Sequence, residues 1–192
     1  KILISFILFF GADILNIFFI KKLKFKTTVL EINPQVLNAC RTWFKLPADD
    51  EKLNVIITDA IAEIKNPKWQ ASVDALQVDL YDDEAKAPVI DTIEFYQDCQ
   101  NLLTETGTMT VNLFGRSSRC DESIEKIKQA FGAKHVWCFK PTKEGNTVIM
   151  AHKQIQTKSQ NELLAASDWV STYSGLPAKK WLKVLEAPSK KD

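Results

Sequence analysis

Three short, mostly apolar segments, each followed directly by an acidic residue, constrain the fold of this chain more than any other feature. The acids are Glu31 after residues 28–30, Asp59 after residues 55–58 and Asp79 after residues 75–78. Segments of this length and composition predict buried β-strands. Each acid alone has a second explanation, as a strand terminator or a helix N-cap. Three in register instead predict a site for hydroxyls, amines or a cationic ligand, because open α/β sheets bind ligands beyond the C-terminal ends of their strands.

Helical patterns alternate with these strands. One helix is expected to start at Pro34, and Gly107 is predicted to end a later helix and to open another strand. The expected helices after the first are at residues 61–64, 92–103 and 121–131, and the later strands are at residues 108–113, 135–139 and 147–152. A hairpin-like turn joins the last two strands. The pattern predicts an α/β fold with a doubly wound, mostly parallel sheet and an antiparallel last strand. It resembles the S-adenosylmethionine-dependent methyltransferase-like (Rossmann-like) type.

The first twenty residues allow two interpretations. Residues 2–20 are nearly all apolar and are bounded by lysines, as in a signal anchor or a membrane span. Asp13 within the segment and Gly11 at its centre are unfavourable in a lipid-facing helix. We therefore favour a buried strand over residues 2–8, a turn, and a helix with Asp13 as its N-cap. A start at Lys1 also indicates that residues upstream are missing.

Composition argues against several classes of protein. A formal net charge of +1, with 26% charged residues, provides no large basic field for nucleic acid. The four cysteines are widely spaced without a CxxC pair, and neither of the two histidines lies near another ligand type. These spacings predict no metal site and no redox motif. A reduced cytoplasmic protein, bound to neither nucleic acid nor membrane, is the expectation.

The composition changes after His152. Residues 153–160 are polar, and helical patterns follow at residues 162–170 and 178–185. We therefore expect a methyltransferase-like nucleoside-binding domain at residues 1–152 and a helical extension at residues 153–192. The extension would pack on the domain or on a second subunit, in the latter case as a homodimer.

Several motifs point to one family. They are residues 29–36 (VLEINPQV), 58–60 (TDA), 78–82 (VDLYD), 94–96 (EFY) and Gly107 through Leu113. Together they resemble the spermidine synthase-like branch of the polyamine aminopropyltransferases, over roughly residues 2–152. An acid after the second strand and one after the third are common to most methyltransferases of this fold. The Asp-x-x-Asp pair formed by Asp79 and Asp82 is the part that resembles an aminopropyltransferase.

The resemblance implies a donor site at the ends of the first three strands. Glu31 would bind the ribose hydroxyls, and Asp59 together with Ala60 would bind the adenine. The implied co-substrate is decarboxylated S-adenosylmethionine or S-adenosylmethionine, with no metal. Gly11 falls where the family carries an acid that holds the amine of the donor. The family loop is glycine-rich because its backbone passes close to the nucleoside, whereas this chain reads LFFGA at residues 8–12.

The resemblance also implies an acceptor site after the fourth strand. Asp79 would hold and deprotonate the attacking amine, and Asp82 with Tyr81 would position the polyamine. The chemistry agrees, because an amine nucleophile must be neutral although alkylamines are mostly protonated at pH 7. One carboxylate can remove the proton, while a second attracts the distal ammonium.

Two functions from different classes remain open. The first is a spermidine synthase-like transferase that moves an aminopropyl group to a polyamine, with an S-adenosylmethionine-dependent methyltransferase as a close variant. The second is a catalytically silent homologue that acts as a binding module. The pair of Asp79 and Asp82 favours the first function. Phe9 and Phe10, in a loop that should be open, favour the second.

Overall fold

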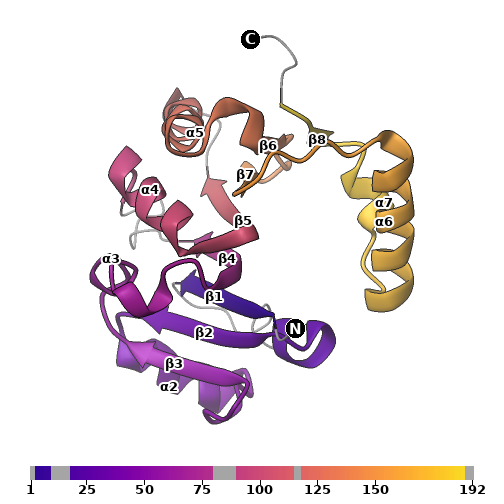
Figure 1. Ribbon diagram of the computed structural model, residues 1–192. Helices are drawn as coiled ribbons and strands as arrows, with labels where there is room; N and C mark the ends of the chain where they lie inside the picture. The colour runs from indigo at the N-terminus through magenta and orange to yellow at the C-terminus, as the bar shows by residue number, and fades with distance from the viewer. Residues whose placement is uncertain (1–2, 10–17, 80–89, 115–117, 189–192) are drawn as a thin grey trace.

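The computed structural model of this chain describes residues 3–9, 18–79, 90–114 and 118–188. Strands and helices alternate along most of its length (Figure 1). The strands are β1 (Ile4–Phe9), β2 (Lys26–Glu31), β3 (Leu53–Ile57), β4 (Val73–Asp79), β5 (Leu103–Phe114), β6 (Val136–Phe139), β7 (Asn146–His152) and β8 (Leu185–Glu186). The helical segments are η1 (Phe18–Leu23), α2 (Pro34–Trp43), α3 (Ala60–Glu63), η2 (Pro67–Trp69), α4 (Ile93–Leu102), α5 (Ser118–Phe131), η3 (Ala133–His135), α6 (Gln160–Ser174) and α7 (Ala178–Trp181).

The described strands form one sheet in the order β3-β2-β1-β4-β5-β7-β6-β8. Strands β3, β2, β1, β4 and β5 pair in parallel, whereas β7, β6 and β8 join through antiparallel ladders. The chain runs outward from β1 to β3 and then returns to β4, so the strand order reverses between β1 and β4. Ligands of open α/β sheets bind at such a switch point. The predicted doubly wound, mostly parallel sheet is confirmed, with more antiparallel pairing than expected.

Helices cover both faces of the parallel part of the sheet. Along β1, Phe6 and Leu8 belong to a large core with α4 and α5, whereas Ile7 belongs to a smaller core with α2. Successive side chains of a strand point to opposite faces, so a central strand buried on both sides reads as continuously apolar. This burial explains why β1 carries the run of isoleucine, leucine and phenylalanine that resembles a membrane segment.

The N-terminal segment contains a sheet strand. β1 lies between β2 and β4, so the interpretation of residues 2–20 as one membrane-spanning helix is wrong, and the predicted strand is confirmed. A helical segment, η1, ends at Leu23, while Asp13 and Gly11 fall outside the described residues. None of the helices in the described part of the chain is long and apolar enough to cross a membrane.

The prediction that Gly107 separates a helix from a strand is wrong. β5 begins at Leu103 and contains Gly107, and its register against β4 shifts between Val73 and Ala75. A Cβ atom at Gly107 would lie 2.7 Å from the carbonyl oxygen of Val73. The glycine is therefore required by the close approach of two strands, not by a turn.

Other helix boundaries also differ from those predicted. α5 begins at Ser118, three residues before the expected start at Asp121. The helix expected over residues 178–185 ends at Trp181, and Leu185 enters β8. β8 pairs with β6 and forms the edge of the sheet, so strand pairing overrides the helical pattern there.

The C-terminal extension contacts the sheet through β8. Its long helix, α6, begins with a capping box between Ser159 and Glu162 and ends at Gly175, whose φ of 77° is the left-handed conformation that glycine adopts without strain. The Tyr173 hydroxyl donates a hydrogen bond of 2.6 Å to the carbonyl oxygen of Lys22. Figure 1 shows α6 and α7 beside the sheet. The division into a domain and an extension at His152 stays a prediction.

Candidate functional site

The C-terminal ends of β2 and β4 bring Glu31 and Asp79 to one edge of the sheet. Asp79 is paired with Phe9 of β1, and Leu8 of β1 is paired with Leu30 of β2. Glu31 and Asp79 therefore lie in one row, with β1 between them. At the usual strand spacing their backbones are about 10 Å apart. Both acids therefore end strands on either side of β1, at the point where the strand order reverses.

Asp79 is a half-buried carboxylate held by an amide. The side-chain amide of Asn112, on β5, donates a hydrogen bond of 3.0 Å to Asp79 Oδ1. The amide of Asn146, on β7, in turn donates a bond of 3.1 Å to Asn112 Oδ1. Burial raises the pKa of Asp79 above its usual value, and the hydrogen bond from Asn112 opposes that rise. The described residues place no hydrogen bond on Asp79 Oδ2.

Glu31 is a buried acid at the end of β2, with only 4% of its surface exposed. Its Oε1 accepts a hydrogen bond of 2.8 Å from the backbone N–H of Asn33, in the turn that leads into α2. Two apolar side chains that are exposed to solvent lie beside it. Ile32 follows it and is 63% exposed, and Ile57 on β3, which pairs with Glu31, is also exposed. The acid thus lies beside an apolar surface open to solvent.

Asp59 has the structural role that any single acid at a strand end can have. It is the N-cap of α3, and its Oδ1 accepts a hydrogen bond of 2.9 Å from the N–H of Ile61. Ala60 is buried and is the first residue of α3, where a backbone N–H lacks an intrahelical acceptor. Asp59 itself is exposed. Its predicted contact with adenine stays a prediction.

Three of the predicted site residues lie outside the described residues. They are Gly11, Tyr81 and Asp82. Phe10 of the predicted open loop also lies outside them. The roles predicted for these residues stay predictions.

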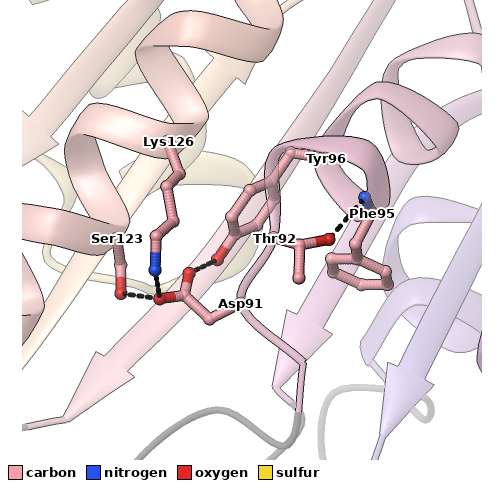
Figure 2. Close-up of polar contacts among 6 residues, drawn as sticks. All are labelled: Asp91, Thr92, Phe95, Tyr96, Ser123 and Lys126. Carbon is pink, nitrogen blue, oxygen red and sulfur yellow. Dashed lines mark hydrogen bonds and ion pairs between the residues drawn. The ribbon is translucent and has the colours of Figure 1, made fainter.

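A polar cluster follows the segment that carries Tyr81 and Asp82. Figure 2 shows Asp91, just before α4, with donors from two helices around its carboxylate. The Tyr96 hydroxyl donates to Oδ1 at 2.9 Å, and Oδ2 accepts from the Ser123 hydroxyl at 3.0 Å and from the Lys126 ammonium at 2.7 Å. Thr92 is the N-cap of α4. The Asp91 cluster, comprising Asp91, Tyr96, Ser123 and Lys126, therefore ties the start of α4 to α5.

Sequence reasoning missed Asn112, Asn146 and Asp91. Asn112 lies in a quoted motif, but its contact with Asp79 depends on the pairing of β4 with β5, whose register shifts between Val73 and Ala75. The signals for Asp91 were weak, namely an acid one residue before a helix N-cap and the spacing of Ser123 and Lys126 on one face of a helix.

The described residues contain no group of three or more histidine, cysteine, aspartate or glutamate side chains that could hold a metal ion. All four cysteines are free thiols. Burial raises the pKa of the Cys99 thiol well above its usual range, so this cysteine behaves as an apolar core residue and not as a nucleophile.

Comparison with solved structures identifies the fold. A probable spermidine synthase from Corynebacterium glutamicum superposes with a TM-score of 0.76 at 19% identity, over 97% of this chain and 67% of that protein. Human methyltransferase-like protein 13, in a complex with SAH, superposes with a TM-score of 0.78 at 18% identity, over 100% of this chain and 86% of that protein. The methyltransferase-like fold is therefore shared with both types of enzyme.

Sequence comparison identifies the family. A polyamine aminopropyltransferase from Neisseria meningitidis serogroup A is 30% identical over 164 residues, which are 84% of this chain and 61% of that protein. The chain thus spans about three fifths of the length of this curated relative. The family profile of the spermine/spermidine synthase domain matches residues 10–162. This chain belongs to the spermine/spermidine synthase domain family.

Proposed function

We propose that this chain transfers an aminopropyl group from decarboxylated S-adenosylmethionine to a polyamine acceptor. The observation that carries the proposal is the environment of Asp79, a half-buried carboxylate at the switch point of the sheet with one oxygen held by Asn112. Membership of the spermine/spermidine synthase domain family and the likeness to a polyamine aminopropyltransferase support it.

The reaction is a displacement at the carbon attached to a sulfonium. A neutral amine attacks this carbon, the carbon–sulfur bond breaks, and methylthioadenosine leaves with the electron pair. The amine must first lose a proton, and Asp79 accepts it. A raised pKa favours this role, because a stronger base takes a larger share of the proton from an alkylammonium. Asp79 Oδ2 is the oxygen assigned to the amine.

In this proposal the donor binds at the C-terminal ends of the parallel strands, from β4 across β1 and β2 to β3. Glu31 accepts hydrogen bonds from the ribose hydroxyls, as an acid at the end of a second strand does in nucleotide sites. The exposed side chains of Ile32 and Ile57 provide an apolar surface for the purine. Asp59 and Ala60 contact the adenine edge, with the N–H of Ala60 as a donor.

The remaining roles rest on the family resemblance. Tyr81 and Asp82 position the acceptor, and Asp82 attracts its distal ammonium. Gly11 lies in the loop that holds the tail of the donor.

The first test is an assay with putrescine and decarboxylated S-adenosylmethionine, with chromatography for spermidine and methylthioadenosine. We expect turnover, and we expect Asp79→Asn to lower kcat by roughly 10²–10⁴-fold because the base is lost. Asp82→Asn should chiefly raise the KM for the amine, since that interaction is present in both ground and transition states. Asp98→Asn, on α4, is the matched control and should change neither parameter.

Methyl transfer is the alternative reaction, favoured by the likeness to methyltransferase-like protein 13. The same assay with S-adenosylmethionine as the donor, read by mass spectrometry of the amine, separates the two. If the unmodified protein yields neither product from putrescine or a longer polyamine, the transferase proposal is wrong and the binding-module hypothesis replaces it.

The second test concerns the nucleoside alone. Methylthioadenosine should bind the protein, and Glu31→Ala should weaken that binding by about 1–3 kcal/mol because the ribose hydroxyls lose a charged acceptor. Glu51→Ala, at an exposed position before β3, is the control and should leave the affinity unchanged. Calorimetry that detects no binding of an adenosyl thioether to the unmodified protein would exclude the nucleoside site.

A further inference from the structure

We infer that Asn112 and Asn146 are positioning residues for Asp79. Asn146 sets the direction of the Asn112 amide, and Asn112 then presents its N–H to Asp79 Oδ1, so that Oδ2 faces the reacting amine. This inference deepens the proposed function and rests on it, because it assumes that Asp79 is the base.

The sheet register places the three side chains in line. Val78 of β4 is paired with Val111 of β5, so Asp79 and Asn112 are neighbours one residue further along. On the other side of β5, Asn146 is opposite Phe114, and Val148 is opposite Asn112. Asn112 and Asn146 are therefore diagonal neighbours on one face of an antiparallel pair, within reach of each other. The last strand hairpin thus contributes a side chain that acts two strands away.

The direction of the two hydrogen bonds, from Asn146 to Asn112 and from Asn112 to Asp79, follows from which groups can donate. An ionised carboxylate only accepts hydrogen bonds, whereas a side-chain amide has a donor end and an acceptor end. Asn112 must therefore turn its nitrogen to Asp79 and its oxygen to β7. Asn146 completes the arrangement by donating to that oxygen at 3.1 Å. This second bond favours the productive orientation of Asn112 over its reverse.

Among the described residues, no charged group is a cause of the raised pKa of Asp79, although the acid Glu31 lies in the same row two strands away. β1 carries no ionisable side chain. β5 carries only Glu105 and β7 only His152, and both lie at the other end of the strands from Asp79. On the face covered by α2 and η1, Lys21 and Lys22 are exposed to solvent, and Arg41 pairs with Asp49. Burial and the Asn112 bond are the two causes of the perturbed pKa of Asp79.

The two asparagines, Asn112 and Asn146, affect Asp79 as a base in two ways. They stabilise the charged form of the carboxylate, which opposes the rise in the pKa of Asp79 that burial causes. They also restrict rotation of the carboxylate, which keeps Oδ2 in one place relative to the amine. The first effect is measurable without any substrate.

The experiment is a titration of the Asp79 carboxyl carbon by ¹³C NMR, assigned through the signal that Asp79→Asn removes. Asn112→Leu should raise the proton affinity of Asp79 by about tenfold or more, since a hydrogen bond to the charged form is lost. Asn146→Leu should raise it by less. Asn54→Leu, on the edge strand β3, is the control and should leave the titration unchanged.

Asn146→Asp tests the direction of the amide. A carboxylate at position 146 only accepts hydrogen bonds, so Asn112 would reverse and face Asp79 with its oxygen. We expect a larger rise in proton affinity than in Asn146→Leu, with most of the excess absent from the double variant Asn112→Leu/Asn146→Asp. If the whole excess survives in the double variant, the new charge acts directly and the inference is wrong. It is equally wrong if Asn112→Leu leaves the titration unmoved.

The titration separates this inference from the proposed function. A protein without transferase activity refutes the function, while the titration still reports whether the amides control Asp79. In an active protein, Asn112→Leu should lower kcat with little change in KM and should move the acidic limb of the pH–rate profile upward. An unchanged profile in a folded Asn112→Leu variant overturns the positioning role.

Discussion

Lys126→Met tests whether the Asp91 cluster holds α4 against α5. The Lys126 ammonium lies 2.7 Å from Asp91 Oδ2, and the two side chains are 33% and 19% exposed. Methionine keeps most of the aliphatic stem and removes the charge. Asp91 would then be left with the hydroxyls of Tyr96 and Ser123, which are buried but neutral donors.

The size of the effect follows from the partial burial of the pair. A hydrogen bond to a charged group contributes about 1.5–3 kcal/mol to stability. Solvent reaches a third of the lysine, and screening lowers this to about 1–2 kcal/mol. Lys128→Met is the matched control on the same helix, because Lys128 pairs with Glu125, whose side chain is 61% exposed. An exposed pair of this kind contributes about 0–0.5 kcal/mol.

Urea denaturation measures both variants. We expect the midpoint of Lys126→Met to fall clearly below that of Lys128→Met, with equal slopes, since the surface exposed on unfolding does not change. Asp91→Asn combined with Lys126→Met should cost less than the sum of the single changes because the partners interact. Equal midpoints for the two lysine variants would show that the cluster contributes no more than a surface ion pair, which would refute the reasoning.

Two further predictions concern the sheet. Gly107→Ala should destabilise the protein by about 1–3 kcal/mol, because its Cβ would meet the Val73 carbonyl oxygen at 2.7 Å and the strands would have to separate; Thr106→Ala, at an exposed neighbour, should stay within about 0.5 kcal/mol in the same denaturation assay. Asp79→Asn should raise the melting temperature at pH 7 and lose that advantage toward pH 3. The pKa of Asp79 is raised by burial, so the unfolded chain releases this proton first and the stability of the unmodified protein falls as pH rises through the raised pKa. If Asp79→Asn melts at a lower temperature than the unmodified protein at pH 7, the prediction for Asp79 is wrong.

The parallel half of the sheet was predictable because its signals are local. Strands β2 and β4 are largely buried and end at an acid, the edge strand β3 ends two residues before Asp59, and Pro34 marks the start of α2 with Asn33 as the N-cap. Burial on both faces made the apolar run of the central strand β1 continuous. The prediction for Gly107 failed for the opposite reason. A glycine is required there by the close approach of Val73 on a neighbouring strand and not by its own sequence neighbours.

The candidate site was predictable only in part, because its polar contacts join distant parts of the chain. Asn112 and Asp79 are separated by 33 residues, and Asn146 and Asn112 by 34. The Asp91 cluster joins residues 32 and 35 positions apart. Such contacts depend on strand register and helix packing, which no local period in the sequence reveals. The acids themselves are visible, but the groups that tune them are not.

The contrast between Asp59 and Asp79 bears most directly on whether the chain is a catalyst or a silent homologue. Both acids follow a strand, yet Asp59 is exposed and caps a helix, a role that stabilises the fold at no cost in desolvation. Asp79 is half-buried, caps no described helix, and has a pKa that burial raises, so its carboxylate lowers stability at neutral pH. A carboxylate that lowers stability and accepts a hydrogen bond from an oriented amide is expected at a site that uses its charge. The environment of Asp79 therefore favours chemistry over a purely structural role.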